Sequence, residues 1–297
     1  MNLKNMQKKT RRQNKFILPL LIFIFSLGTF AQTAPQEKTA TVFGARIRYL
    51  EAGDATRPTV ILLHGLGAQA ETWQLNIGAL AANYRVIAPD QVGFGKSDKP
   101  FLKYRVATYA DFLDKFMAEL KIEKAHLVGN SMGGWVAALT AIKYPNRVEK
   151  IVLADAAGIV PANFSEAAVY QLNNSTRDEI RANLKLIFAS PALQNNEALV
   201  DQFMTQRVLA GDGYTISSLI ESIKRREDFL DSRLGEIKKP TLIIWGKQDG
   251  LLPVADAEIF NKGIAGSELV IFDNCGHVPQ FEKAADFNAA VLKFLAK

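Results

Sequence analysis

This chain has few of the residues that build metal, redox or disulfide-linked sites. It holds one cysteine, Cys275, and three histidines among 297 residues. One cysteine cannot form an internal disulfide, and so few scattered ligands exclude the usual metal sites. A dinucleotide fingerprint is also missing, because the segment Gly93-Phe94-Gly95 is not followed by the third glycine of that motif. We therefore predict a protein that works without a metal or another cofactor.

The chain also lacks a net charge once its first residues are set aside. It carries 36 basic and 30 acidic residues, and six of the basic ones but no acidic one lie within residues 1–31. The remaining residues, 30 of each sign, are formally neutral and offer no basic footprint for nucleic acid. We therefore expect no nucleic acid as a partner.

Long apolar runs are missing except near the N-terminus. Residues 16–30 are apolar and uncharged, follow the six basic residues, and end beside the small residues Thr29 and Ala31. These three regions are typical of a secretory signal peptide. A run of about 15 residues is short for a membrane span, which needs ~20. We predict a signal peptide over 1–31, cleaved after Ala31, and export to the periplasm or the medium.

The alternative for the N-terminus is an uncleaved membrane anchor formed by residues 16–30. Membrane contact is otherwise expected only through a lipid substrate, because the neutral mature chain has no electrostatic attraction to anionic lipid.

The rest of the chain alternates between strand-like and helical stretches. Its apolar runs are mostly continuous, as in a parallel sheet that is covered on both faces. Strands are expected at 41–50, 59–63, 85–89, 125–129, 150–154, 241–245 and 268–272, and helices at 108–120 and 284–295. This order predicts an α/β fold with a doubly wound, mostly parallel sheet. The first run, 41–50, is expected to form an antiparallel hairpin with the segment after residue 50.

Residues 159–234 interrupt this alternation. They show no clear strand and contain stretches of helical period, such as 177–188 and 197–209. We interpret them as a helical cap inserted into a core made of residues 32–158 and 235–297. Such a cap builds the walls of an apolar pocket and shields the chemistry below it from water.

The most specific motif lies at residues 129–133, Gly-Asn-Ser-Met-Gly, which fit the G-x-S-x-G nucleophile elbow. The apolar run 125–128 before it predicts a strand, and the small apolar residues 134–139 after it predict a helix. A serine in such a turn is exposed at strained backbone angles, and the flanking glycines leave room where strand and helix crowd together. We therefore predict Ser131 as a nucleophile.

A serine hydroxyl needs a base at neutral pH, and elimination among three histidines points to one candidate. His126 lies on the strand that leads to Ser131, roughly 16 Å away at ~3.3 Å per residue. His64 directly follows the strand 59–63 and suits a role in shaping a loop. His277 follows the late strand 268–272, in a loop from which it can reach Ser131. We predict His277 as the base.

The base needs a carboxylate to hold its tautomer. Asp249 follows the strand 241–245 and lies between Ser131 and His277 in the chain, which is the order of α/β-hydrolases. Asp155, directly after the strand 150–154, is the rival. We favour Asp249, because Asp155 is followed by small residues that we interpret as the start of the cap.

Acyl transfer also needs donors for an oxyanion. The backbone N–H of Met132, the residue after the nucleophile, is the first candidate. The second is the backbone N–H of Leu66, in the glycine-rich loop after the strand 59–63.

Several motifs in the same order as in known proteins carry a resemblance. They are His64-Gly65-Leu66-Gly67, Asp90-Gln91-Val92-Gly93-Phe94-Gly95-Lys96-Ser97-Asp98, Gly129-Asn130-Ser131-Met132-Gly133-Gly134, Gly246-Lys247-Gln248-Asp249 and Gly276-His277. Over residues 39–296 the chain resembles the α/β-hydrolase fold superfamily, in its serine esterase and lipase branch close to the meta-cleavage product hydrolases. The resemblance is specific for the fold and the triad and less so for the substrate.

The resemblance implies two activities. The first is an exported carboxylic-ester hydrolase, a lipase or esterase, that works through an acyl-enzyme on Ser131 and has a small-molecule ester or a lipid as its partner. The alternative is a carbon–carbon bond hydrolase of meta-cleavage products, in which a cap arginine binds the substrate carboxylate; Arg207 is the candidate for that substrate-binding role. Against the alternative stand Val278, where that subfamily carries an aromatic residue, and an export signal on a type of enzyme that works in the cytoplasm. A binding protein without turnover on the same fold is the third hypothesis.

Overall fold

The structure is a computed structural model that describes residues 34–160, 169 and 172–297. The expected signal peptide therefore lies outside the described residues, and so does part of the expected cap. The described residues belong to one compact unit, Thr33–Lys297. Among them, no helix combines the length and the apolar character that crossing a membrane requires.

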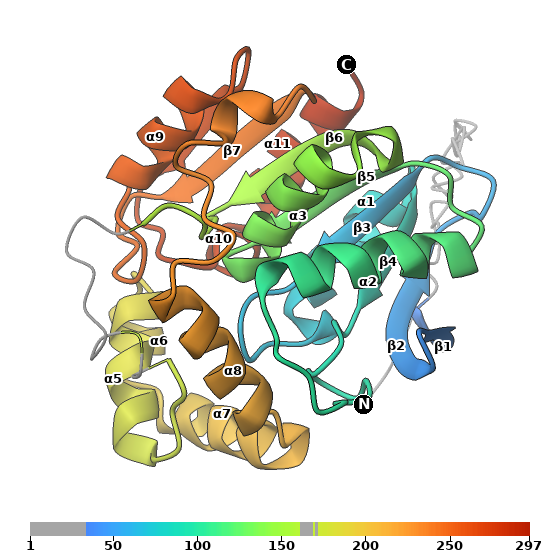
Figure 1. The fold of residues 1–297 in the computed structure, drawn as a ribbon. Coiled ribbons are helices and arrows are strands. Elements are labelled where there is room, and N and C mark those ends of the chain that lie inside the picture. The colour runs from blue at the N-terminus through green and yellow to red at the C-terminus, as the bar shows by residue number, and fades with distance from the viewer. Residues whose placement is uncertain (1–33, 161–168, 170–171) are drawn as a thin grey trace, which may run out of the picture. The chain divides into compact units, whose positions relative to one another are not determined.

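A mostly parallel sheet forms the centre of the molecule (Figure 1). In the described residues it has eight strands, in the order β1-β2-β4-β3-β5-β6-β7-β8. They are β1 (Gln36–Val42), β2 (Ala45–Ala52), β3 (Thr59–Leu63), β4 (Arg85–Pro89), β5 (Ala125–Asn130), β6 (Val148–Ala154), β7 (Thr241–Gly246) and β8 (Glu268–Phe272). From β4 to β8 all neighbours run parallel, whereas β2 pairs antiparallel with both β1 and β4. The predicted fold class is confirmed.

The expected strand at 41–50 is wrong, because a turn divides this run. Phe43 and Gly44 both have positive φ, 50° and 82°, and join β1 to β2 in a tight hairpin. Two residues with positive φ match the right-handed twist of the paired strands. The hairpin is therefore made by β1 and β2, and the segment after residue 50 is not its second strand.

Helices cover both faces of the sheet, and successive strand residues point to opposite faces. On β3, Ile61 and Leu63 belong to one core and Val60 and Leu62 to the other. The core helices are α1 (Gln74–Ala81), α2 (Val106–Glu119), α3 (Met132–Lys143), α9 (Ala255–Gly263), α10 (Pro279–Glu282) and α11 (Ala284–Leu295). Buried residues of α2, α3 and α9 pack in the first core, and those of α1 and α11 in the second. The expected helices 108–120 and 284–295 correspond to α2 and α11.

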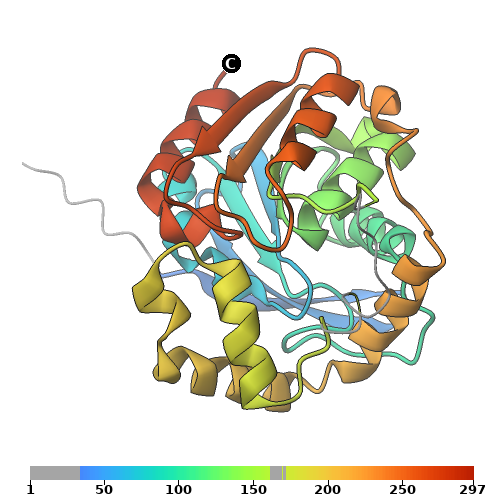
Figure 2. The ribbon, with the colours of Figure 1, turned by 90° about the vertical axis from the view of Figure 1, so that its left-hand side faces the viewer.

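Four described α-helices separate β6 from β7 and lie beyond the carboxyl ends of the parallel strands in Figure 1, with a second view in Figure 2. They are α5 (Arg177–Ile187), α6 (Pro191–Gln194), α7 (Glu197–Ala210) and α8 (Gly213–Lys224). α5 begins with a capping box, in which the Thr176 side chain accepts from the Glu179 N–H. The helical stretches expected at 177–188 and 197–209 are α5 and α7, and the limits of the cap, 159 and 234, stay a prediction.

Candidate active site

Ser131 lies between β5 and α3 with backbone angles of φ 56° and ψ −122°. Such angles are costly for a residue with a side chain and persist only where the surroundings enforce them. The glycines two residues before and two residues after Ser131 allow the close packing that enforces these angles. A Cβ on Gly129 would lie 2.2 Å from the Gly133 carbonyl oxygen, and one on Gly133 would lie 2.1 Å from that of Leu63. The crowding predicted from the motif is therefore present.

Two backbone N–H groups, one at the elbow and one in the loop after β3, have no acceptor in the described chain. Met132 is the first residue of α3, so its N–H has no partner within the helix. Gly65 lies against the nucleophile, because a Cβ built on it would be 3.2 Å from Ser131 Cβ and 3.6 Å from Ser131 Oγ. Within the described part of the chain, neither the Met132 N–H nor the Leu66 N–H donates a hydrogen bond to a protein group. Both remain candidates for an oxyanion.

His64 holds the loop that carries Leu66. Its Nε2 accepts from the Gln91 N–H at 3.0 Å, which leaves the proton on Nδ1 to be donated to the Gly65 carbonyl oxygen at 2.8 Å. The Gln91 side chain also donates to the His64 carbonyl oxygen at 2.8 Å. Burial lowers the pKa of His64, which favours the neutral ring that this bonding needs. The structural role expected for His64 agrees with these contacts.

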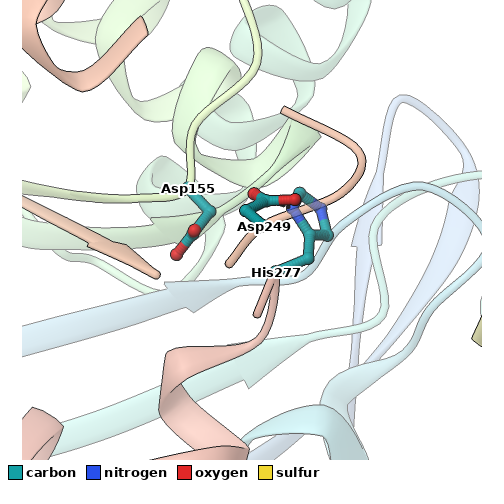
Figure 3. Close-up of side chains that lie close together, drawn as sticks. All are labelled: Asp155, Asp249 and His277. Atoms are coloured by element: carbon teal, nitrogen blue, oxygen red, sulfur yellow. Dashed lines mark hydrogen bonds and ion pairs between the residues drawn. The ribbon is translucent and has the colours of Figure 1, made fainter. Parts of the chain in front are cut away.

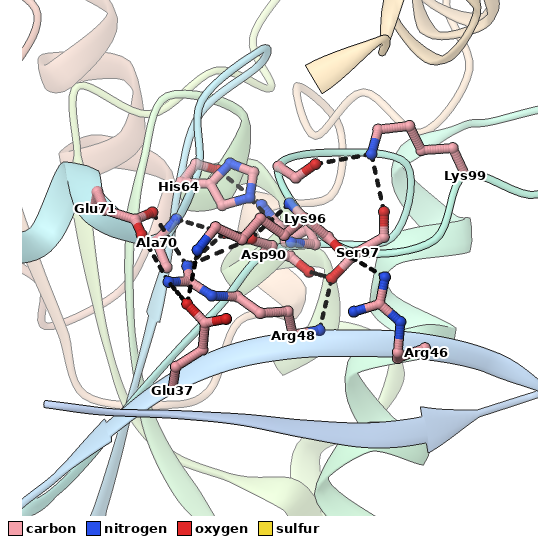
Figure 4. A network of polar contacts seen from close by, with 12 residues as sticks. Glu37, Arg46, Arg48, His64, Ala70, Glu71, Asp90, Lys96, Ser97 and Lys99 are labelled. Carbon is pink, nitrogen blue, oxygen red and sulfur yellow. Dashed lines mark hydrogen bonds and ion pairs between the residues drawn. The ribbon is translucent and has the colours of Figure 1, made fainter. Parts of the chain in front are cut away.

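A buried polar network supports the same loop from the side of β4 (Figure 4). Asp90, which is fully buried, accepts from the Ala70 N–H at 2.7 Å and from the Lys96 N–H at 2.8 Å. Arg48 of β2 lies 3.4 Å from Asp90 and forms ion pairs with Glu71 at 2.6 Å and with Glu37 at 2.7 Å. The network joins the β1–β2 hairpin to the loops after β3 and β4.

His277 and Asp249 are in direct contact (Figure 3). The distance from His277 Nδ1 to Asp249 Oδ2 is 2.7 Å. The other oxygen, Asp249 Oδ1, accepts from the N–H groups of Leu251 at 2.8 Å and Leu252 at 3.0 Å. Three donors therefore converge on a carboxylate that is fully buried. This arrangement favours an ionised Asp249 and leaves His277 Nε2 to take up a proton.

Asp155 lies behind Asp249 rather than against the histidine. It follows β6, is fully buried, has a positive φ of 42°, and accepts from the Gly246 N–H at 2.9 Å. One oxygen each of Asp155 and Asp249 and one His277 nitrogen lie within 4.8 Å of one another. The contact with the ring thus belongs to Asp249, the carboxylate preferred from the sequence.

Two hydrogen bonds hold the backbone of His277. Its carbonyl oxygen accepts from the Asn130 side chain at 2.9 Å, and its N–H donates to the Ile187 carbonyl oxygen at the end of α5. Asn130 also donates to the Ala154 carbonyl oxygen at 3.2 Å. Sequence reasoning missed Asn130 and Ile187, because the signal for Asn130 is only the variable position of the elbow motif and Ile187 contributes a backbone atom.

Ser131 and His277 are not hydrogen-bonded to each other in the described chain. Such bonds are often long without a substrate and tighten when one binds. His126, by contrast, pairs in register with Val60 at the start of β3 and packs edge-on against Tyr84, with ring centroids 5.9 Å apart. It lies away from the elbow, as expected.

Arg207, the cap residue expected to bind substrate, lies beside the glycine-rich loop. Its Nη1 would be 3.7 Å from a Cβ on Gly67. The guanidinium is already engaged: it pairs with Asp212, and it donates to the Asn173 side chain at 2.6 Å and to the Asn174 carbonyl oxygen at 3.2 Å. Asp212 has only 1% of its surface exposed. Sequence reasoning did not single out Asp212.

A parallel sheet with the elbow serine and the histidine–carboxylate pair after its strands defines a hydrolase of the α/β class. The chain belongs to the α/β hydrolase fold family, whose pattern matches residues 58–284. Over 265 residues it is 37% identical to the 2-hydroxy-6-oxononadienedioate/2-hydroxy-6-oxononatrienedioate hydrolase of Escherichia coli, covering 85% of this chain and 91% of that one.

Two solved structures show the same likeness. A meta-cleavage product hydrolase from Pseudomonas fluorescens superimposes with a TM-score of 0.80 at 31% identity, over 87% of this chain and 97% of that one. A bacterial membrane phospholipase A superimposes with a TM-score of 0.78 at 31% identity, over 89% of this chain and 87% of that one. The predicted closeness to the meta-cleavage product hydrolases is confirmed.

Proposed function

We propose that this protein hydrolyses a carbon–carbon bond next to a ketone, in a conjugated substrate that carries a carboxylate. The observation that carries this proposal is the 37% identity to a dienedioate hydrolase over 85% of this chain. Arg207, a cap arginine beside the loop that bears the Leu66 N–H, is the candidate for the substrate carboxylate. A cation at this place can hold a substrate carboxylate while the ketone lies over Ser131. The relatives named as dienedioate or meta-cleavage product hydrolases support this choice over the ester hydrolase favoured by the sequence alone.

The site can perform this reaction with its own residues. Ser131 Oγ adds to the ketone carbon and its proton passes to His277 Nε2, while Asp249 holds the ring through Nδ1. The N–H groups of Leu66 and Met132 stabilise the oxyanion. When the oxyanion collapses, the carbon–carbon bond breaks, and the bonding electron pair stays on the leaving carbon, where the conjugated system stabilises it.

That carbon takes the proton from His277, which leaves an acyl group on Ser131. Water then adds to the acyl carbon and gives a proton to His277. Collapse of this second oxyanion releases the carboxylic acid and returns the proton to Ser131. The net change is the addition of one water across the broken bond.

A carboxylic-ester hydrolase, lipase or esterase, is the second candidate, and the state of Arg207 favours it. The pairing with buried Asp212 offsets the positive charge that a substrate carboxylate would need. The likeness to a membrane phospholipase A also supports it. In an ester, the alcohol leaves in place of the carbon, and the roles of Ser131, His277 and Asp249 stay the same.

The two candidates differ in their dependence on Arg207. The experiment compares the purified protein and Arg207→Gln on a 2-hydroxy-6-oxononadienedioate substrate, followed by loss of its visible absorbance, and on neutral p-nitrophenyl esters. We expect kcat/KM for the dienedioate to fall about a hundredfold, because Arg207→Gln removes one partner of the charge pair with the substrate carboxylate. Such a truncation costs about 2–5 kcal/mol. Turnover of the neutral esters should change little.

Arg177→Gln is the control for the loss of a cap arginine as such; Arg177 is exposed and its partners are Glu197 and Asp201. Ser131→Ala should remove turnover of both substrates apart from a small residual activity. Turnover of esters alone, equal in wild type and Arg207→Gln, would establish the second candidate. Labelling of Ser131 by a fluorophosphonate without turnover of either substrate would instead support the binding protein.

A further inference from the structure

Two buried carboxyl groups share the space behind His277. Asp155 follows β6 and Asp249 follows β7, strands that are neighbours in the sheet. Both side chains are fully buried, and an oxygen of each lies within 4.8 Å of the other (Figure 3). Two like charges at this separation in a dry interior repel strongly, so both groups cannot be ionised without a counter-ion.

The hydrogen-bond donors around the two groups are unequal. Asp249 receives three: the His277 ring and the N–H groups of Leu251 and Leu252. Asp155 receives one, from the Gly246 N–H to Oδ1. Asp155 Oδ2 is buried and has no donor in the described chain. Because donors stabilise the ionised form, the negative charge belongs on Asp249 and the proton on Asp155.

The charged groups that act most strongly on Asp155 in the described chain are acidic. Glu282 and Asp249 both act on it with negative charge, and Cys275, in the next loop, has its thiol pKa raised by burial. Within the described residues, no lysine or arginine forms an ion pair with Asp155. The pKa of Asp155 is raised well above its ordinary range by its burial and by the nearby Asp249 carboxylate.

We propose that Asp155 keeps a proton on Oδ2 and donates it in a hydrogen bond to the Asp249 carboxylate, and so acts as a positioning residue for the acid that orients His277. A neutral donor at this place removes the repulsion and adds a fourth hydrogen bond to Asp249. Asp155 carries this proton whichever substrate the enzyme cleaves.

The test uses two substitutions that separate the donor from the charge. Asp155→Asn is nearly the same shape as the protonated acid: its oxygen can accept from the Gly246 N–H and its NH₂ can donate to Asp249. Asp155→Ala removes the donor and leaves a gap. The rate of fluorophosphonate labelling of Ser131 is measured against pH for both variants and the wild type, because it requires no knowledge of the substrate.

We expect Asp155→Asn to label within about twofold of the wild type, with the acid limb of its pH profile unmoved. Asp155→Ala should label about ten- to a hundredfold more slowly, because a hydrogen bond to a charged group is lost. Folding of each variant is checked by its thermal unfolding. Fluorophosphonate labelling also continues if the proposed substrate is wrong, which keeps the two proposals distinguishable.

An ionised Asp155 would give a different result. Its negative charge would favour the protonated imidazole, so its removal in Asp155→Asn would move the acid limb to lower pH by about one unit or more. That shift, or equal rates in all three proteins, would overturn the proposal. A rate in the wild type that falls on addition of EDTA would also do so, because a bound cation would then relieve the repulsion.

A direct measurement covers the case in which Asp155→Asn does not fold. Infrared spectra of the wild type should show the carbonyl stretch of a protonated carboxylic acid that persists at neutral pH, where exposed carboxyl groups are ionised. Absence of such a band at neutral pH would refute the proton on Asp155.

Discussion

Close backbone packing at the elbow restricts which residue types fit there. The backbone of Ser131 is held in a region that residues with side chains rarely adopt, and the neighbouring strand and helix approach too closely for anything but glycine on either side. The conformation of the serine in this motif is therefore a consequence of backbone packing. Substitutions beside it should lower the stability of the whole domain.

Replacing Gly133 by Ala should destabilise the protein by about 3 kcal/mol or more, because the added methyl would meet a backbone carbonyl that cannot move away. Gly235→Ala is the matched control: a Cβ there has no neighbour within 4 Å. Its free energy of unfolding should change by no more than ~0.5 kcal/mol. Urea unfolding of the two variants checks both values, and equal stabilities would contradict the crowding argument.

At the scale of elements, charged groups connect the antiparallel hairpin to the parallel part of the sheet. Arg48 on β2 has 2% of its side chain exposed and faces three carboxylates from β1, the η1 turn (Ala70–Trp73) and the loop after β4. Buried charges of this kind are costly to leave without a partner. The hairpin and the loop that carries Leu66 should therefore lose stability together.

Arg48→Met should lower the free energy of unfolding by about 3 kcal/mol, the lower part of the range for breaking a buried pair, because Asp90 keeps its backbone donors. Arg46→Met is the control on the same strand. Arg46 is about half exposed, and its pair with Asp98 at 3.4 Å should contribute under ~1 kcal/mol. Chemical denaturation compares the two, and a loss for Arg48→Met no larger than for Arg46→Met would refute a structural role of the network.

For the whole molecule, buried histidines link stability to pH. Burial lowers the pKa of His126, so the unfolded chain, in which the pKa is about 6.5, binds the proton first as the pH falls. Protonation therefore favours the unfolded state below that pH, and the stability is fully present above it.

The variant His126→Phe isolates this effect, since a phenyl ring can keep the edge-on contact with Tyr84. Below pH ~6.5, the stability of the wild type should fall relative to the variant by about 1.4 kcal/mol per pH unit, until the folded-state pKa is reached. Thermal or urea unfolding over a pH series measures the difference. A difference that stays constant with pH would show that His126 takes up its proton equally in both states.

The location of the protein is a second property of the whole chain. We propose that it is exported and cleaved after Ala31, on the basis of the basic residues, the apolar run and the small residues at the N-terminus. N-terminal sequencing after expression in a bacterial host should find a chain that begins at or near Gln32. A full-length chain in the membrane fraction would show that residues 16–30 are an anchor, and a full-length chain in the cytoplasm would rule out export.

Much of this architecture could be predicted from local patterns. The continuous apolar runs correspond to β3 to β8, and the elbow motif located Ser131, because strand period and turn chemistry are properties of neighbouring residues. The hairpin was predicted less well. A run from 41 to 50 reads as one strand, and only the positive φ angles of Phe43 and Gly44 reveal the turn inside it.

The sequence by itself determined the parallel sheet, the order of the candidate triad and the three histidines from which one base could be chosen, since each depends on residue type and spacing along the chain. Only the tertiary structure decided which carboxylate contacts His277, that Asn130 and Ile187 hold its backbone, and that Asp212 pairs with Arg207. These contacts join β5, β7, the late loops and the cap across long separations in sequence. Their geometry depends on how the sheet and the cap pack, which no local pattern encodes.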